Sequence, residues 1–215
     1  MEGGTEEEFV KRVLADHLRT AGVEPTPILL GRARSRFGGG NVSVERLVSE
    51  MVELSRSFDA VTSFVDFYGF RRKGEQSAED LENILDQRLR QRMGNRWHPS
   101  RVIPYVQRHE FESLLFSNVD AFGHVLGASS GAVDDLRAIR AEFSTPEDIN
   151  DSTQTCPSRR IERCLPAYSK RRDGPRVAED IGLATMCSEC PRFRDWLTSL
   201  ESARQDTRAG LGERR

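Results

Sequence analysis

Ala60-Val61-Thr62-Ser63-Phe64-Val65 is the clearest strand in this sequence, and Asp66 follows it directly. Its β-branched and aromatic side chains are typical of a buried strand. A second run of this kind spans residues 101–106, and a helical pattern from about Ala78 to Met93 lies between the two. Strands that alternate with helices of this length predict an α/β protein with a mainly parallel sheet flanked by helices.

Apolar residues at helical spacing extend this pattern toward the N-terminus. Thr5 stands three residues before Glu8, which is the spacing of a capping box at the start of a helix. The further predicted elements are a helix over residues 5–22, a short buried strand over residues 27–30, a glycine turn at residues 38–40 and a helix over residues 44–54.

The second half of the chain has a different pattern from the first. From Phe111 onward the pattern is almost wholly helical, and a polar loop over residues 144–157 interrupts it. The last residues have the composition of a frayed tail. We therefore predict an α/β core over residues 1–116, a helical extension packed on that core over residues 117–201, and a flexible tail over residues 202–215.

Composition limits the class of protein. The chain has 215 residues and a net charge of -2, which excludes a wholly basic surface but not a local basic stripe. No apolar run approaches the roughly 20 residues that span a bilayer, and no signal sequence is visible, so we expect a cytoplasmic protein without membrane contact. Cys156, Cys164, Cys187 and Cys190 leave a zinc site open, but reduced cysteines in or near the core are the favoured interpretation.

Carboxylates stand at three places where parallel strands would end. Asp66 follows the first strand described above, Glu110 and Glu112 follow the second, and Glu2 precedes the first helix. Each of them alone also fits a structural role, such as a partner of a helix dipole. The carboxyl ends of parallel strands meet at one edge of a sheet, where gathered carboxylates repel each other unless a cation neutralises them. Their common position therefore favours a site for Mg²⁺ or Mn²⁺, which prefer oxygen ligands.

The position of Glu2 raises a question about the first strand. A strand of about five apolar residues is expected before it, whereas the sequence begins at Met1. We expect the first strand to be truncated here, with in-frame upstream DNA that encodes a short hydrophobic run.

These motifs resemble the TOPRIM fold of topoisomerases, primases and OLD-family nucleases, in which a glutamate ends the first strand and an aspartate motif ends a later one. Glu2, Gly3 and Glu6 match the Glu-Gly-x-x-Glu form of OLD-like members. Asp66 matches the first aspartate of the later motif, whereas Tyr68 stands where a second aspartate is usual. The resemblance implies a Rossmann-like sheet and a metal site whose ligands are Glu2, Glu6, Asp66 and Glu110.

The chain is more specifically similar to a bacterial family of unknown function that is classed as TOPRIM-like, over nearly all of residues 1–201. This similarity implies a nuclease, an ATPase of the AAA or ABC type as a partner, and a role as an effector in phage defence. The motifs that carry it are Glu2-Gly3-Gly4-Thr5-Glu6, Val65-Asp66-Phe67-Tyr68-Gly69, His109-Glu110-Phe111-Glu112, Pro146-Glu147-Asp148-Ile149-Asn150, Pro157-Ser158-Arg159-Arg160-Ile161 and Asp173-Gly174-Pro175.

A basic segment lies between Ser158 and Arg176, in a protein whose net charge is negative. Such clusters hold phosphate backbones, and a solvated helix face is an equally weighted alternative. The resemblance to OLD-like nucleases implies that Lys170 stabilises the charge that develops on the reacting phosphate. The residues predicted to bind nucleic acid are Arg159, Arg160, Arg163, Arg171, Arg172 and Tyr168, the last by stacking on a base.

The loop at residues 146–151 is rich in oxygen ligands, which would suit a metal site or a lid. It does not follow a predicted strand, so we favour a role for Glu147 and Asp148 in bracing the loop.

The leading hypothesis is a Mg²⁺-dependent phosphodiesterase that cleaves DNA or RNA. Its catalytic residues are Glu2, Asp66, Glu110, Glu112 and Lys170, with Glu110 and Glu112 as further ligands or as the base toward water. The missing second aspartate keeps open a non-catalytic regulatory or binding partner of an ATPase. A third hypothesis is an enzyme that processes small nucleotides at the same metal site.

Overall fold

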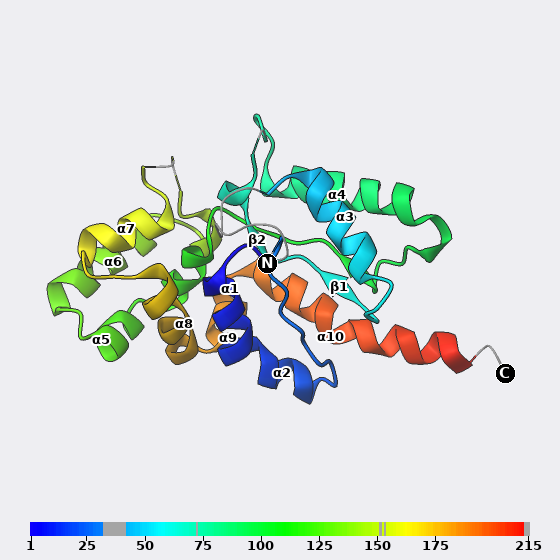
Figure 1. Ribbon diagram of the computed structural model, residues 1–215. Coiled ribbons are helices and arrows are strands. Elements are labelled where there is room, and N and C mark those ends of the chain that lie inside the picture. The colour runs from blue at the N-terminus through cyan, green and yellow to red at the C-terminus, as the bar shows by residue number, and fades with distance from the viewer. Residues whose placement is uncertain (32–41, 72, 151, 153, 213–215) are drawn as a thin grey trace.

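A computed structural model describes residues 1–31, 42–71, 73–150, 152 and 154–212, so the predicted glycine turn at residues 38–40 lies outside the described residues. The described part is a mainly helical α/β structure with two small parallel sheets and a helical C-terminal region (Figure 1). The predicted parallel pairing is confirmed. The paired strands are β1 (Val61–Thr62) with β3 (Val102–Ile103) and β2 (Val65–Asp66) with β4 (Val106–Gln107).

Each of the two predicted strands is divided into two short ones. The hydroxyl of Ser63 donates a hydrogen bond to the carbonyl oxygen of Tyr105 and accepts one from the Tyr105 backbone N–H, both at 2.9 Å. The neighbouring Pro104 has no backbone N–H to donate to a ladder. A side chain thus replaces the backbone ladder at the midpoint of each strand.

The helices begin and end close to the predicted positions, apart from the N-cap of the first. Gly3 rather than Thr5 precedes this helix, because Oε2 of Glu6 accepts a hydrogen bond from the Gly3 backbone N–H at 2.9 Å. The helices are α1 (Gly4–Phe9), the π-helical turn η1 (Val10–Leu14), α2 (Ala15–Thr20), α3 (Val44–Leu54), α4 (Ala78–Met93), α5 (Ala121–Leu126), α6 (Ser130–Ala141), α7 (Pro157–Cys164), α8 (Lys170–Ile181), α9 (Leu183–Glu189) and α10 (Pro191–Gly212). Four short 3-10 segments join them, namely η2 (Phe67–Gly69), η3 (Gly94–Arg96), η4 (Phe111–Ser117) and η5 (Pro146–Asp148).

One predicted element is wrong. Residues 27–30 form no strand, because Pro25 and Pro27 lack the N–H groups of a ladder. Their nearest backbone partner is Met1, whose ammonium group donates to the carbonyl oxygen of Ile28 at 3.0 Å. The helix α10 continues to Gly212, and the predicted flexible tail over residues 202–215 stays a prediction.

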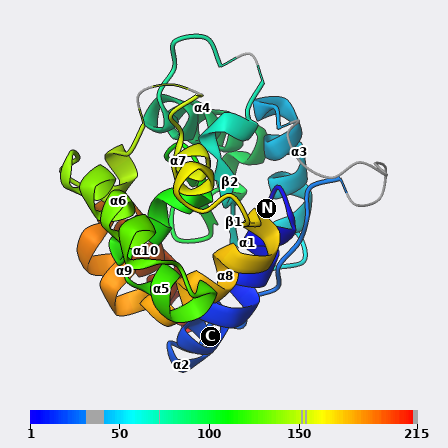
Figure 2. The same ribbon diagram turned by 90° about the vertical axis from the view of Figure 1, so that its left-hand side faces the viewer.

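Side chains of the strands alternate between two apolar clusters, one on each face of the sheets. Val65 and Val106 pack with α3 and α4 in the smaller cluster. Phe64 and Tyr105 belong to the larger cluster, together with side chains from α1, α2 and the helices that follow η4. This alternation with a period of two places helices on both faces of the strands, as Figures 1 and 2 show.

The larger cluster joins the two ends of the chain. In it α1 packs against α8 (Figure 2), so the first helix lies beside a segment that the sequence predicted as part of a helical extension. The predicted domain boundary after residue 116 stays a prediction. Among the helices of the described ranges, none has both the length and the apolar character needed to cross a membrane.

Candidate functional site

The candidate site lies at the carboxyl ends of β2 and β4. Asp66, the last residue of β2, accepts a hydrogen bond at Oδ1 from the Phe111 backbone N–H at 2.9 Å. The Tyr68 N–H donates to the carbonyl oxygen of His109 at 3.2 Å. These two hydrogen bonds hold the turn after β2 against the segment that enters η4, and they bring two of the predicted carboxylate motifs together.

Lys170, the first residue of α8, lies between two buried carboxylates. Its Nζ is 3.1 Å from Oδ2 of Asp66 and 2.8 Å from Oε2 of Glu112. Glu112 is fully buried, Asp66 is 8% exposed, and the Lys170 side chain is 34% exposed. The hydroxyl of Tyr168 donates to the other oxygen of Glu112 at 3.4 Å. We call Asp66, Glu112 and Lys170 the carboxylate–lysine centre.

Burial dominates the electrostatics of this centre. It raises the pKa of Asp66 to about 7 and the pKa of Glu112 to about 8, although Lys170 attracts both negative charges. The charge of Glu110 adds repulsion at both carboxylates. Burial also opposes the charge of Lys170, but the carboxylates around it outweigh burial and raise the pKa of the ammonium group. The two carboxylates therefore titrate near neutral pH beside an ammonium group that stays charged.

The other predicted carboxylates surround the centre, each with a structural contact. Oε2 of Glu110 accepts a hydrogen bond from the Ser158 backbone N–H at 3.0 Å, at the start of α7. Glu6 caps α1 and still lies close enough for its charge to raise the pKa of Asp66. Glu2 lies against η2, the turn that directly follows Asp66.

The contact of Glu2 depends on a glycine. A Cβ atom added at Gly69 would lie 1.9 Å from Oε2 of Glu2, which is far inside van der Waals contact. We expect Gly69→Ala to displace the Glu2 carboxylate and to lower the free energy of unfolding by about 1 kcal/mol, the low end of the cost of overpacking, because the clash is with the end of a flexible side chain. Denaturant unfolding measures this change. Gly131→Ala in α6 is the matched control, since no atom lies within 4 Å of its added Cβ. Equal effects of the two substitutions would contradict the assigned contact.

The basic segment is only partly available for phosphate. Tyr168 is 8% exposed and bonded to Glu112, a position that does not favour the predicted stacking on a base. Arg160, which is predicted to bind nucleic acid, is 9% exposed, and its Nε donates to the Thr155 carbonyl oxygen at 2.7 Å. The exposed arginines of the segment are Arg159, Arg163, Arg171, Arg172 and Arg176, and of these Arg159 pairs with Glu162 while Arg172 and Arg176 pair with Asp173.

The donor atoms of the site suit a hard divalent cation. They are carboxylate oxygens, and more of them gather here than one lysine neutralises, as the raised pKa values of Asp66 and Glu112 show. In the described part of the chain, however, no three His, Cys, Asp or Glu side chains are arranged to hold a metal ion together. Lys170 lies in the space between Asp66 and Glu112, so a cation would have to displace its ammonium group.

The loop before α7 is braced as predicted. Oδ2 of Asp148 accepts hydrogen bonds from the N–H and the hydroxyl of Thr145, at 3.2 Å and 2.8 Å. Glu147 accepts hydrogen bonds from the backbone N–H groups of Arg192 and Phe193, at 2.9 Å and 3.1 Å, at the start of α10. Asp148 thus stabilises the loop, and Glu147 stabilises the N-terminus of α10.

The four cysteines agree with the favoured interpretation. All are free thiols; Cys156 and Cys190 are buried, and Cys164 and Cys187 are partly buried. Burial raises the pKa of Cys190 well above its usual range. Their positions in or near the core agree with the favoured interpretation, and their reduced state stays a prediction.

A second group of polar and aromatic residues lies beside the centre, and sequence reasoning missed it. His109 has a backbone φ of 66°, a left-handed conformation that is uncommon outside glycine. Burial lowers the pKa of His109 to about 4, so its ring is neutral at pH 7. Burial raises the pKa of Tyr68, and a hydrogen bond from Asn150 opposes that shift. No local sequence signal predicted this conformation, because it depends on contacts between distant segments.

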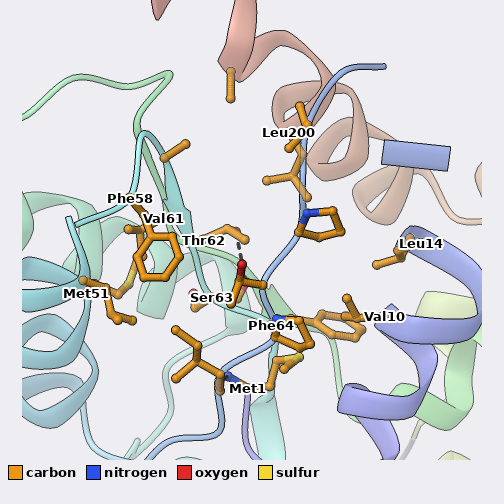
Figure 3. A pocket seen from close by; sticks show the side chains of 18 of the residues that line it. Met1, Val10, Leu14, Met51, Phe58, Val61, Thr62, Ser63, Phe64 and Leu200 are labelled. Carbon is orange, nitrogen blue, oxygen red and sulfur yellow. Dashed lines mark hydrogen bonds between the residues drawn. The ribbon is translucent and has the colours of Figure 1, made fainter. Parts of the chain in front are cut away.

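An apolar cavity among the described residues is separate from the centre. It has a volume of about 180 Å³ and lies between the first helices, α3, β1 and α10, with mostly apolar walls (Figure 3). None of the three residues of the carboxylate–lysine centre lines it. The cavity therefore belongs to the packing between the N-terminal and C-terminal segments.

These features define the class of the protein. It is an α/β protein with a buried carboxylate–lysine centre at the carboxyl edge of parallel strands. The chain belongs to the family described as Domain of unknown function (DUF4276), whose family model matches residues 1–201. No curated protein and no solved structure matches the chain. Membership of a family of unknown function is thus confirmed, and the relation to TOPRIM proteins stays a prediction.

Proposed function

We propose that this protein is a TOPRIM-like phosphodiesterase that cleaves DNA or RNA with Mg²⁺ or Mn²⁺. The carboxylate–lysine centre is the observation that carries the proposal. Asp66, Glu112 and Lys170 come from three separate segments and meet at the carboxyl edge of parallel strands, with Glu2 and Glu110 beside them. Burying two carboxylates costs free energy, and carboxylates buried at such a cost are concentrated at functional sites.

The residue that would hold the metal is Asp66, with Glu2 and Glu110 as further oxygen donors, which leaves Glu112 free to act as a base. A divalent cation, when bound, polarises a phosphoryl oxygen and lowers the pKa of a bound water. Glu6 is assigned to the cap of α1 instead, because one of its oxygens is bonded to the Gly3 N–H.

The chain's own groups supply charge and a proton acceptor. The ammonium group of Lys170 remains charged and would donate to a phosphate oxygen. Glu112, with a pKa of about 8, would accept the proton of the attacking water at Oε2, because a general base works best when its pKa is near the working pH. The exposed Arg171 crosses the start of α1 over Gly4 and would contact a flanking phosphate.

A cleavage assay tests this proposal. The purified chain is incubated with single- and double-stranded DNA and RNA in Mg²⁺, in Mn²⁺ and in EDTA, beside the Asp66→Asn variant from the same purification. We expect cleavage by the wild type that requires the metal and is lost in the variant. Equal cleavage by the wild type and the Asp66→Asn variant would indicate a contaminating nuclease and would contradict the proposal.

A second candidate function is a non-catalytic partner of an ATPase. It is favoured by the contact of Lys170 with both carboxylates and by Tyr68 in place of a second aspartate. Calorimetry with Mg²⁺ and Mn²⁺ separates the two candidates: metal binding that Asp66→Asn weakens supports the enzyme. No binding, together with stable co-purification with an ATPase, supports the partner. A panel of small nucleotides in the cleavage assay tests the third hypothesis.

A further inference from the structure

An aromatic group with a lysine adjoins the carboxylate–lysine centre. The ring centroids of Phe67 and Tyr68 are 5.7 Å apart, and the ring of His109 lies 5.9 Å from that of Tyr68. Nζ of Lys73 is 4.2 Å from the Phe67 ring centroid and 4.6 Å from the Tyr68 ring centroid. With Asn150, which contacts the Tyr68 hydroxyl, we call these residues the Tyr68 cluster.

Two polar atoms of the Tyr68 cluster have unused hydrogen-bonding capacity. Nδ1 of His109 and Oδ1 of Asn150 are buried and make no hydrogen bond to any residue within the described ranges. A buried polar atom without a partner costs about 1–3 kcal/mol. The backbone of His109 is held in the left-handed region as well, and such strain is found where a structure positions a side chain for function.

The Tyr68 cluster and the carboxylate–lysine centre share two turns of the backbone. Phe67 and Tyr68 directly follow Asp66, and His109 directly precedes Glu110. The charge of Glu110 acts on Tyr68 and on both carboxylates of the centre. The Tyr68 cluster therefore directly adjoins the carboxylate–lysine centre on both turns.

We infer that the Tyr68 cluster binds an unpaired nucleobase next to the phosphate at the carboxylate–lysine centre, so that single-stranded nucleic acid is the substrate class. The Tyr68 ring stacks on the base, while His109 and Asn150 bond to its polar edge. Bases in a duplex are stacked on each other and cannot make these contacts. This inference rests on the proposed function, because it takes the position of the phosphate from it.

A fluorescence titration tests the inference without cleavage. A single-stranded oligonucleotide that carries 2-aminopurine is titrated with the full chain in EDTA, and stacking of the base on Tyr68 is expected to quench it. Tyr68→Leu is expected to weaken binding about tenfold or more, since stacking on an aromatic ring contributes roughly 1–3 kcal/mol per base. Tyr68→Phe keeps the ring and is expected to bind like the wild type. An oligonucleotide with abasic sites is expected to bind wild type and Tyr68→Leu equally.

The controls keep the result interpretable. Trp97→Leu is the matched variant, since Trp97 is also half-buried under a cation, with the Arg90 guanidinium carbon 3.9 Å from its ring centroid, beyond the far end of α4. It is expected to leave binding unchanged. Should Tyr68→Leu fail to fold by circular dichroism, His109→Asn replaces it, because asparagine tolerates a positive φ. A smaller loss of affinity, about twofold to tenfold, is expected, because this variant removes a hydrogen bond to the base and not the stacking ring.

The possible results separate this inference from the proposed function. Cleavage by the wild type without quenching, or equal binding by wild type and Tyr68→Leu, overturns the base site and leaves the nuclease standing. Quenching without metal-dependent cleavage supports the base site and overturns the nuclease. Two results overturn the assignment of single-stranded nucleic acid. One is equal quenching of 2-aminopurine fluorescence in a duplex and in the single strand. The other is a mononucleotide that displaces the oligonucleotide when both are present at equal concentration.

Discussion

Lys170→Met is expected to lower the free energy of unfolding at pH 8 by about 2–4 kcal/mol. Removing one partner of a buried ion pair leaves the other charge uncompensated, which typically costs about 3–5 kcal/mol. The expected loss is smaller here because the Lys170 side chain is 34% exposed and solvent screens part of the interaction. Urea unfolding followed by circular dichroism gives the value directly.

The loss in Lys170→Met should also depend on pH. Asp66 and Glu112 have folded-state pKa values of about 7 and about 8, raised by burial above the values of the unfolded chain, near 4. The folded state therefore binds more protons than the unfolded state between about pH 4 and pH 8, and its stability falls as the pH rises through this window. Without the ammonium group this fall steepens, so the variant should recover much of its stability at pH 5.

Lys11→Met is the matched control for this experiment. Lys11 also contacts two carboxylates, with Nζ 2.8 Å from Glu7 and 3.7 Å from Glu8, but on the solvent-exposed side of α1 and η1. Exposed ion pairs contribute little to stability. We expect little change at any pH. Equal losses in Lys170→Met and Lys11→Met would mean that burial does not set the strength of the Lys170 contacts.

Asp66→Asn is expected to reduce metal-dependent cleavage about a thousandfold or more while the fold remains. Asparagine keeps an oxygen that accepts the Phe111 N–H and removes the charge that faces Lys170 and the metal. Losing several kcal/mol of charge stabilisation in the transition state corresponds to a rate loss of this size. Initial cleavage rates at saturating Mg²⁺ measure it.

Two measurements accompany this variant. The midpoint of thermal unfolding should stay close to the wild-type value at pH 7, since the buried charge that is lost was itself costly to bury. The decline in stability between about pH 4 and pH 7 should become shallower, because Asp66 no longer titrates there. Asp59→Asn removes an exposed carboxylate and should change neither property. An unfolded Asp66→Asn protein would contradict the assignment of Asp66 to chemistry rather than to folding.

Regular patterns in the sequence predicted the regular parts of the fold. The apolar run that ends at Asp66 and the helix at residues 78–93 were found because burial on one face imposes a fixed period on the side chains. Convergence of Asp66 and Glu112 followed from the rule that parallel strands end at one edge. The contact of Lys170 with both is compatible with the role that the family resemblance implied, and the measurements above test that role.

Non-local contacts account for the features that sequence reasoning missed. The Ser63 hydroxyl bonds to Tyr105 across the sheet. Pro104 beside Tyr105 signals a weak point in one strand, but no residue near Ser63 predicts the interruption of the other. The charged neighbours of Tyr168 and Arg160 predict contact with nucleic acid, yet tertiary packing buries both side chains. Intrinsic preferences of short segments are weak compared with such packing.

The order in which the segments are synthesised gives the contacts of Lys170 a further consequence. Ribosomes add roughly 5–20 residues per second and release the N-terminal part first. Asp66 and Glu112 therefore leave the ribosome several seconds before Lys170, and burying them during that interval would bury two negative charges without a counter-ion. We therefore expect this edge of the sheet to stay hydrated in the nascent chain until α8 emerges. Closure of the centre is then a late step of co-translational folding.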